Sequence, residues 1–244
     1  MQHQTEATQL TIAAASDIKI KTTIKRLHQA KQVFPHCRAI LFTSKQISEA
    51  TGEIEIIRIN PLDSLRAYSD FIIYSLHHYI DSTHVLIVQW DGFIVNPNRW
   101  DQEFLNYDYI GAPFIPRSNN WGYSRDANGG FYAVGNGGFT LRSKRLLAAP
   151  TQLGLLDDVQ LTNHHEDGFF CVLHRTTLEQ QGFQWAPTAS AFRFAIESPL
   201  ERRHLLLPSF GIHGRRALSL YRLGVCHLAS HLVREDGKRK YQED

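Results

Sequence analysis

Asp91 stands at the end of an apolar run, in the stretch VLIVQWDGFIVNP (Val85–Pro97). The run Val85–Trp90 predicts a buried strand, and residues two apart on a strand point to the same side, so Gln89 and Asp91 would share a face. One carboxylate and one amide oxygen suit Mg²⁺ or Mn²⁺ when phosphate oxygens supply further ligands. Gly92 would let a ligand approach closely. The alternative is that Asp91 and Gly92 only form a turn.

A second group of chemically active side chains is the run His164-His165-Glu166-Asp167-Gly168, which precedes an apolar helix start. A carboxylate at this position could act as a general base that takes a proton from a hydroxyl nucleophile. Acidic residues also stabilise a helix N-terminus through the helix dipole, which is the simpler explanation. Glu166 and Asp167 are both candidates for the base, and we favour Asp167.

Two glycine-containing segments complete the set of candidates. Asn136-Gly137-Gly138 could bring the backbone close to a ligand or adopt positive φ, although Asn-Gly is also a strong hairpin signal. His213 lies between glycines in FGIHG (Phe210–Gly214). A lone histidine is usually structural, but the small neighbours make a metal-facing position plausible here.

The elements that must position these residues alternate between strands and helices in the first half of the chain. We expect strands at Leu10–Ala15, Arg38–Thr43 and Ile54–Ile59, and helices at Ile18–Val33 and Ser64–Ile80. Such alternation is typical of a parallel sheet with helices on both faces, where ligands sit outside the carboxyl ends of the strands. Ser16, Asp17 and Asp91 fall at such ends.

The second half is richer in loops. Gly111–Gly138 is dominated by Gly, Asn, Pro and aromatic residues, and we expect helices at Arg142–Ala149 and Asp167–Gln180. We predict one domain over 1–244, with a nucleotide-binding half (10–100), an acceptor and catalytic half (101–214) and a basic helical tail (215–244).

Composition excludes several classes of protein. The 244 residues are 43% hydrophobic and 20% charged with a net charge of +2, and the basic residues are dispersed, so we expect no nucleic-acid partner. Three separated cysteines argue against a disulfide scaffold. The N-terminal residues lack a signal-peptide pattern, and no apolar run reaches the roughly 20 residues of a membrane span. We therefore expect a soluble cytoplasmic protein.

Taken together, these motifs resemble glycosyltransferases of the GT-A type, and more specifically the DUF5672 family. The similarity rests on four segments and extends weakly from Leu10 to about Gly214; the segments are Val85–Phe114, Val134–Ser143, His165–Cys171 and Phe210–Gly214. The resemblance implies an α/β fold with a Rossmann-type nucleotide-binding half, a mostly parallel central sheet flanked by helices, and a loop-rich acceptor half.

The resemblance also implies a metal site. GT-A enzymes usually carry an Asp-any-Asp motif whose last acid binds a divalent cation on the donor diphosphate. The matching triplet is Gln89-Trp90-Asp91, so the first acid is missing. Asp91 would bind Mn²⁺ or Mg²⁺, Gln89 would be a weaker ligand or contact the donor sugar or ribose, and His213 would complete the metal shell.

The remaining roles follow from the same likeness. The Glu166-Asp167 step matches the position of the catalytic base in inverting transferases. Asn136-Gly137-Gly138 would line the donor or acceptor sugar pocket, and Ser16 and Asp17 would hold the nucleoside.

The expected reaction moves a sugar from a nucleotide-sugar, with a UDP-sugar as the expected donor, to a hydroxyl of a glycan, polysaccharide or glycolipid. Trp121 and Tyr123 could stack on an acceptor sugar or simply pack. The basic residues near the end of the chain could contact anionic lipid at the inner membrane face, or could form a solvated helix face; they are Arg202, Arg203, Arg215, Arg216 and Arg222. Two rivals remain: a metal-dependent hydrolase or nucleotidyltransferase, and an inactive glycan-binding protein.

Overall fold

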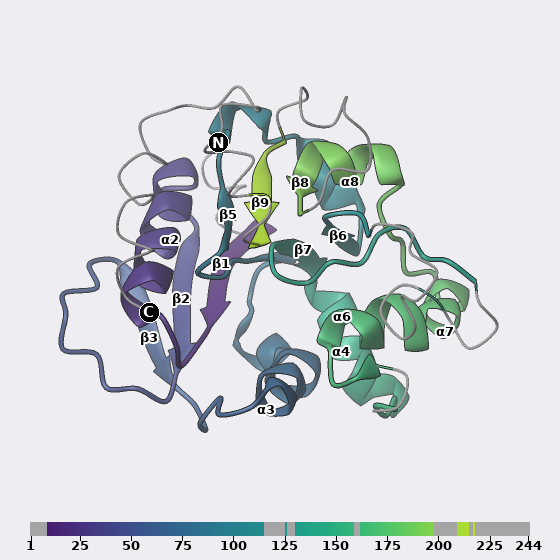
Figure 1. The fold of residues 1–244 in the computed structure, drawn as a ribbon, viewed down its shortest axis with the longest axis horizontal. Helices are drawn as coiled ribbons and strands as arrows, with labels where there is room; N and C mark the ends of the chain where they lie inside the picture. Colours follow the sequence, from purple (N-terminus) through teal and green to yellow (C-terminus); the bar gives the residue numbers. More distant parts are fainter. Residues whose placement is uncertain are drawn as a thin grey trace.

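A computed structural model of the chain describes residues 9–114, 125, 130–158, 162–197, 209–214 and 217. Its centre is a six-stranded sheet in the order β3-β2-β1-β4-β7-β6 (Figure 1). The strands are β1 (Leu10–Ala15), β2 (Arg38–Thr43), β3 (Ile54–Arg58), β4 (His84–Ile87), β6 (Tyr109–Gly111) and β7 (Thr140–Ser143). Only β7 runs antiparallel to its neighbours in this sheet. The predicted α/β fold with a mostly parallel sheet is confirmed.

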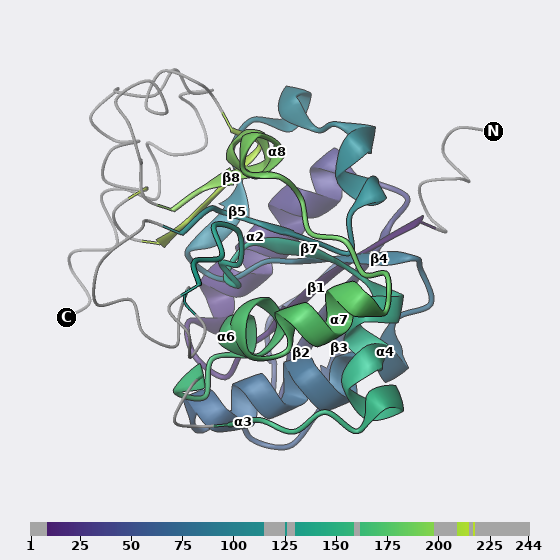
Figure 2. The same cartoon turned by 90° about the vertical axis from the view of Figure 1, so that its right-hand side faces the viewer.

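Both faces of the sheet are covered, which explains why its strands are continuously apolar. Along β1, Ile12 and Ala14 pack into one core and Ala13 and Ala15 into the other. Figure 2 shows α2 (Ile20–Val33) and α8 (Thr188–Phe194) on one side of the sheet, and α3 (Leu65–Asp70) and α4 (Lys144–Leu153) on the other. The result is a three-layer arrangement that leaves the strand ends for a site.

A second, three-stranded sheet brings distant parts of the sequence together. Its order is β5 (Gly92–Ile94), β9 (Gly211–His213) and β8 (Ala195–Ile196), with β9 antiparallel to β5 and parallel to β8. Gly92 pairs with His213, so the two predicted metal ligands, Asp91 and His213, lie on neighbouring strand ends. Further helical segments are η3 (Pro97–Arg99), η4 (Gln102–Asn106), α6 (Glu166–Gly168), η5 (Phe169–Leu173) and α7 (Arg175–Gln180).

Several element boundaries differ from the sequence prediction. The expected helix Ser64–Ile80 is one helical path that begins as α3, continues as the π-helix η1 (Phe71–Ser75) and ends as the 3₁₀ helix η2 (Leu76–Tyr79). Ser64 caps it by accepting a hydrogen bond from the Ala67 amide at 3.1 Å. The predicted helix Asp167–Gln180 starts one residue earlier and is interrupted between η5 and α7.

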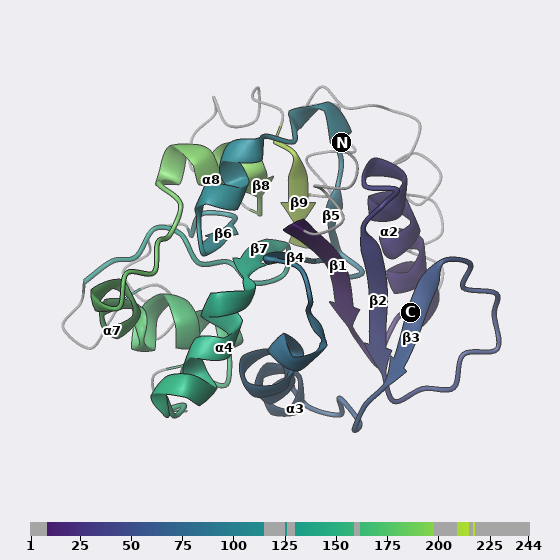
Figure 3. The same ribbon diagram turned by 180° about the vertical axis from the view of Figure 1, so that it is seen from behind.

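The prediction for Arg142–Ala149 was wrong at its start. Arg142 and Ser143 belong to β7, and the helix α4 begins after them, as Figure 3 shows from behind. The Ser143 hydroxyl accepts a hydrogen bond from the Leu146 amide at 3.1 Å, which fixes this boundary. The strands β6 and β7 come from the predicted acceptor half and complete the sheet of the nucleotide-binding half.

Some expectations fall outside the described residues. They concern Trp121, Tyr123, the basic residues Arg202, Arg203, Arg215, Arg216 and Arg222, and the tail 215–244 apart from residue 217. In the part of the chain that the structure describes, no helix has both the length and the apolar character needed to cross a membrane.

Candidate functional site

Asp91 and His213 are brought together as predicted. The Asp91 Oδ1 and His213 Nε2 atoms lie 3.9 Å apart, and the two side chains are only 14% and 17% exposed. The Gly214 amide donates a hydrogen bond to the Asp91 carbonyl at 3.0 Å, which fastens the end of β9 to this residue. Burial lowers the pKa of the His213 ring, but the nearby carboxylates, Glu197 first among them, raise it above its ordinary value.

The backbone around Asp91 differs from the predicted strand. β4 ends at Ile87, and the amides and carbonyls of Gln89 and Gly92 bond to each other at 2.9 and 3.1 Å. Trp90 and Asp91 therefore occupy the corner of a tight turn, so strand alternation does not place Gln89 and Asp91 on one face. The Gln89 amide group donates to the Tyr68 hydroxyl at 2.9 Å. Asp91 therefore lies in a turn, as the simpler alternative predicted, and the same turn presents its carboxylate as a candidate cation ligand.

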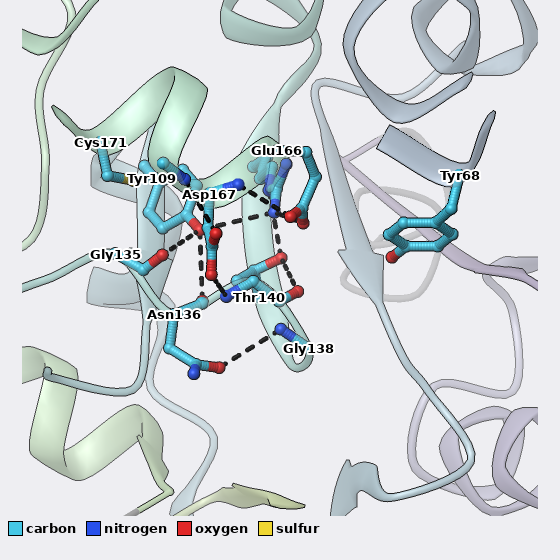
Figure 4. A network of polar contacts seen from close by, with 12 residues as sticks. Tyr68, Tyr109, Gly135, Asn136, Gly138, Thr140, Glu166, Asp167 and Cys171 are labelled. Carbon is cyan, nitrogen blue, oxygen red and sulfur yellow. Dashed lines mark hydrogen bonds and ion pairs between the residues drawn. The ribbon is translucent and has the colours of Figure 1, made fainter. Parts of the chain in front are cut away.

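The two acids of the Glu166-Asp167 step have different surroundings, although both are buried. Glu166 Oε1 accepts a hydrogen bond from Arg142 Nη2 at 2.6 Å, in an ion pair whose arginine is completely buried. From the described residues, Asp167 accepts only backbone amide hydrogen bonds, from Gly137 at 3.2 Å and Gly168 at 2.8 Å. Figure 4 shows this polar network.

Burial, and next the neighbouring Glu166 carboxylate, raise the pKa of Asp167 well above its ordinary value. A carboxylate with a raised pKa is a stronger base. The Tyr68 hydroxyl also lies within the electrostatic reach of these acids: burial, and then the Glu166 charge, raise its pKa. The environment therefore suits Asp167 to proton transfer and Glu166 to holding Arg142.

The Asn136-Gly137-Gly138 loop lies between the acid pair and His213. A Cβ at Gly137 would collide with Glu166 Oε1, and one at Gly138 would collide with the His213 ring. Neither glycine has positive φ. The glycines are thus needed for close approach. The sequence analysis expected that approach to be to a ligand, whereas the groups approached here are the side chains of Glu166 and His213. Asn136 itself is buried.

Ser16 and Asp17 lie at the end of β1, as predicted. Asp17 accepts four hydrogen bonds: from the Thr43 hydroxyl, the Ser44 amide, the Ser44 hydroxyl and the Leu62 amide, at 2.8, 2.7, 2.6 and 2.8 Å. Burial alone would raise the pKa of Asp17, but these hydrogen bonds lower it to about 2. Asp17 therefore fastens the loops after β2 and β3 to the end of β1. The Ser16 hydroxyl donates to the Ile18 carbonyl at 2.6 Å.

Glu197 is a site residue that the sequence analysis missed. It follows β8, and Oε2 accepts a hydrogen bond from Asn136 Nδ2 at 2.5 Å, while Oε1 lies 3.5 Å from His213 Nδ1. The available signal was an acid that ends the apolar run Phe194-Ala195-Ile196, the same signal that singled out Asp91.

A large groove runs along the loop after β3 and the helical path that follows it. It has a volume of about 1030 Å³ and includes Arg58, Leu62, Arg66, Phe71 and Tyr74 in its lining. None of the predicted site residues lines it. It does reach the loop that Asp17 holds, because the Leu62 amide is one of the donors to that carboxylate.

The donor set fits a cation that is shared with a ligand. Asp91 and His213 offer one carboxylate and one imidazole, and the described residues contain no group of three His, Cys, Asp or Glu side chains arranged to hold a metal ion. Mg²⁺ is commonly held by one or two protein ligands together with substrate phosphates and water. The pair therefore suits a cation completed by a diphosphate and does not suit a closed structural site.

The family of the chain follows from comparison with known proteins. A family model described as "Protein of unknown function (DUF5672)" matches residues 52–213. The chain belongs to this family. The match covers Asp91, the Asn136–Gly138 loop, the acid pair and His213, and leaves Ser16 and Asp17 outside. No curated protein matches the chain.

A solved structure shows the same fold. It is described as a glycosyltransferase involved in the glycosylation of the major capsid of PBCV-1, and it is 12% identical with a TM-score of 0.53. The alignment covers 88% of this DUF5672 chain and 98% of that structure. The DUF5672 chain therefore has a glycosyltransferase-like fold over most of its length.

Proposed function

We propose that this DUF5672 protein is a glycosyltransferase of the GT-A type that transfers a sugar from a nucleotide-sugar to a hydroxyl group of a glycan or glycolipid. The observation that carries the proposal is the approach of Asp91 to His213, 3.9 Å apart and mostly buried, in a glycosyltransferase-like fold. The buried acid Asp167 supports it as a candidate base.

In the proposed site, Asp91 and His213 hold Mn²⁺ or Mg²⁺, and a UDP-sugar is the donor. Such a cation neutralises charge on a diphosphate leaving group. Ser16 and Asp17 contribute to the nucleoside end, where Asp17 acts through the loops that it fastens, because its oxygens already accept four hydrogen bonds.

Asp167 takes the proton from the acceptor hydroxyl in this mechanism. The acceptor oxygen forms a bond to the anomeric carbon, the bond from that carbon to the diphosphate oxygen breaks, and the nucleoside diphosphate leaves with the electron pair. A single displacement of this kind inverts the anomeric centre. Glu166 stays paired with Arg142, and Asn136, Gly137 and Gly138 keep the acid pair and His213 in register.

A thermal-shift screen of UDP-, GDP-, dTDP- and CMP-sugars, each with and without Mn²⁺, tests the proposal. A bound donor at about 100 times its Kd should raise the unfolding temperature by roughly 5–10 °C, and only with Mn²⁺ present. The Asp91→Asn variant should lose this increase, whereas Glu55→Gln, at the exposed Arg38–Glu55 pair, should keep it. A panel in which no nucleotide-sugar shifts the wild-type protein would contradict the proposal.

Slow release of UDP from the donor in the absence of acceptor would separate an active enzyme from the inactive glycan-binding alternative. This assay is needed because the chain has Gln89 where the Asp-any-Asp pattern has its first acid.

A further inference from the structure

Glu197 connects two parts of the site that are far apart in the sequence. Its Oε2 accepts the hydrogen bond from Asn136 Nδ2 at 2.5 Å, and its Oε1 faces His213 Nδ1 at 3.5 Å. Asn136 in turn accepts a hydrogen bond from the Gly138 amide at 3.3 Å through Oδ1. Since the Asn136 amide can only donate through Nδ2, the carboxylate of Glu197 is held in one orientation.

The two nitrogens of the His213 ring face different acids. Nδ1 faces Glu197 at 3.5 Å and Nε2 faces Asp91 at 3.9 Å. Nδ1 is buried and makes no hydrogen bond within the part of the chain that the structure describes, so the 3.5 Å approach of Glu197 is an ion-pair contact that has not closed into a hydrogen bond. Gly138 lies against the ring, where any larger residue would collide with it. The ring is therefore fixed in position, and its tautomer depends on which acid accepts its single proton.

We propose that Glu197 is a positioning residue that accepts the Nδ1 proton of His213 and so leaves the Nε2 lone pair directed at Asp91. The shorter of the two contacts decides the tautomer, because a ring N–H is stabilised by the nearer carboxylate. A carboxylate behind a histidine orients the ring and increases its basicity as a metal ligand. The metal-binding consequence rests on the proposed function, whereas the tautomer itself does not.

The tautomer can be measured in the metal-free protein. Long-range ¹H–¹⁵N spectra of the His213 side chain, recorded at a pH where the ring is neutral and assigned with His213→Ala, should show the proton on Nδ1. In Glu197→Gln, the new amide oxygen should accept from Asn136, so that its NH₂ group faces His213 Nδ1. The proton should then move to Nε2.

A compensating variant makes this test independent of general damage. In Asn136→Asp/Glu197→Gln, the Gln NH₂ donates to the new Asp, and its oxygen faces Nδ1 again, so the Nδ1–H tautomer should return. The new Asp can still accept the Gly138 amide. Glu55→Gln, at the exposed Arg38–Glu55 pair, should leave the His213 spectrum unchanged. A wild-type ring protonated on Nε2, or a tautomer that Glu197→Gln does not change, would overturn the proposal.

The effect of Glu197 on metal binding is tested in a separate experiment, in which electron paramagnetic resonance measures the affinity for Mn²⁺ in the presence of UDP. Glu197→Gln should weaken Mn²⁺ binding about 10–100-fold, and the double variant should recover most of it. If wild-type protein binds no Mn²⁺ with UDP, the proposed function fails, and the tautomer measurement still decides the role of Glu197. If Mn²⁺ binds equally well to wild-type and Glu197→Gln proteins, the positioning role is overturned.

Discussion

At the scale of single residues, neighbouring acids with the same chemistry have different tasks because of what they touch. The Glu166 charge is neutralised by Arg142 at 2.6 Å, and Arg142 has no exposed side-chain surface. The Asp167 carboxylate is held by amide groups, and no cationic side chain in the described ranges forms a hydrogen bond or ion pair with it. The buried pair is structural in this interpretation, and Asp167 is the proton acceptor.

Asp167→Asn should remove transfer and preserve donor binding. An amide cannot accept the proton, so UDP release from the donor should fall about 10²–10⁴-fold, while the thermal shift by donor and Mn²⁺ remains. Since the raised pKa of Asp167 keeps it protonated to higher pH, wild-type activity should be lost on the acid side at a pH above the ordinary value of about 3.9. If Glu166→Gln instead abolishes transfer in a folded protein, the base is on the wrong residue.

Glu166→Gln should act mainly on stability. It leaves the Arg142 guanidinium buried without its counter-charge, and breaking a buried ion pair typically costs about 3–5 kcal/mol. Urea unfolding would measure the change. The matched control is Glu55→Gln, which breaks an exposed pair with Arg38 and should cost less than about 1 kcal/mol. Equal losses in the two variants would contradict this role for Glu166.

At the scale of elements, a loop and two strand ends must pack closely for the site to form. Gly138 and Gly92 let the 136–138 loop, the Gln89–Gly92 turn and the end of β9 touch: a Cβ at Gly92 would collide with the Gly138 carbonyl. At the same carboxyl edge of the sheet, Asp17 fastens the loops after β2 and β3. Backbone spacing, more than side-chain identity, sets the geometry here.

Gly138→Ala should therefore damage both stability and metal binding. The added methyl group collides with the His213 ring, and overpacking of this kind typically costs about 1–3 kcal/mol. Differential scanning calorimetry should show a lower unfolding temperature. The double variant Gly138→Ala/His213→Ala removes the obstructing ring and should recover much of the lost stability, although not Mn²⁺ binding. A double variant that is no more stable than Gly138→Ala would place the clash elsewhere.

The Asp17 contacts predict a specific pH dependence. The folded pKa of about 2 lies below the unfolded value of about 3.9, so the ionised carboxylate stabilises the fold above that unfolded value. This contribution is lost as the pH falls through about 2. The difference in unfolding free energy between wild type and Asp17→Asn should therefore be full at neutral pH and shrink between about pH 4 and about pH 2. Denaturant titrations across this range would measure it, and a difference that does not change with pH would contradict this stabilising role of Asp17.

At the scale of the whole molecule, the cation stoichiometry separates the proposed transferase from its nearest rival. Hydrolases and nucleotidyltransferases commonly gather several acids around two metal ions. The described residues bring one carboxylate and one imidazole together in the candidate cation site.

With UDP present, we expect one Mn²⁺ per chain and none in Asp91→Asn, as equilibrium dialysis would show. Two tightly bound ions per chain would favour the two-metal chemistry.

The sequence alone determined most of the local elements and singled out most of the side chains that the candidate site contains. The bounds of β1 and β2 agree with the prediction, because a mostly apolar run of six residues flanked by polar ones fits a short buried strand better than a helix. The helix predicted from Ser64 onward does begin at this residue, which is its N-cap. These features depend on neighbours in the chain, which a sequence displays.

Tertiary structure decided which of those side chains meet. The sequence prediction placed Arg142 in a helix. In the structure it lies buried in a strand, and such a position is stable because Glu166, which is remote in the sequence, neutralises its charge. The role of Glu197 depends on contacts with Asn136 and His213, which are remote in the chain. The packing of the two sheets determines which of these side chains become neighbours. That packing depends on contacts between residues far apart in the chain, and local sequence patterns contain no information about such contacts.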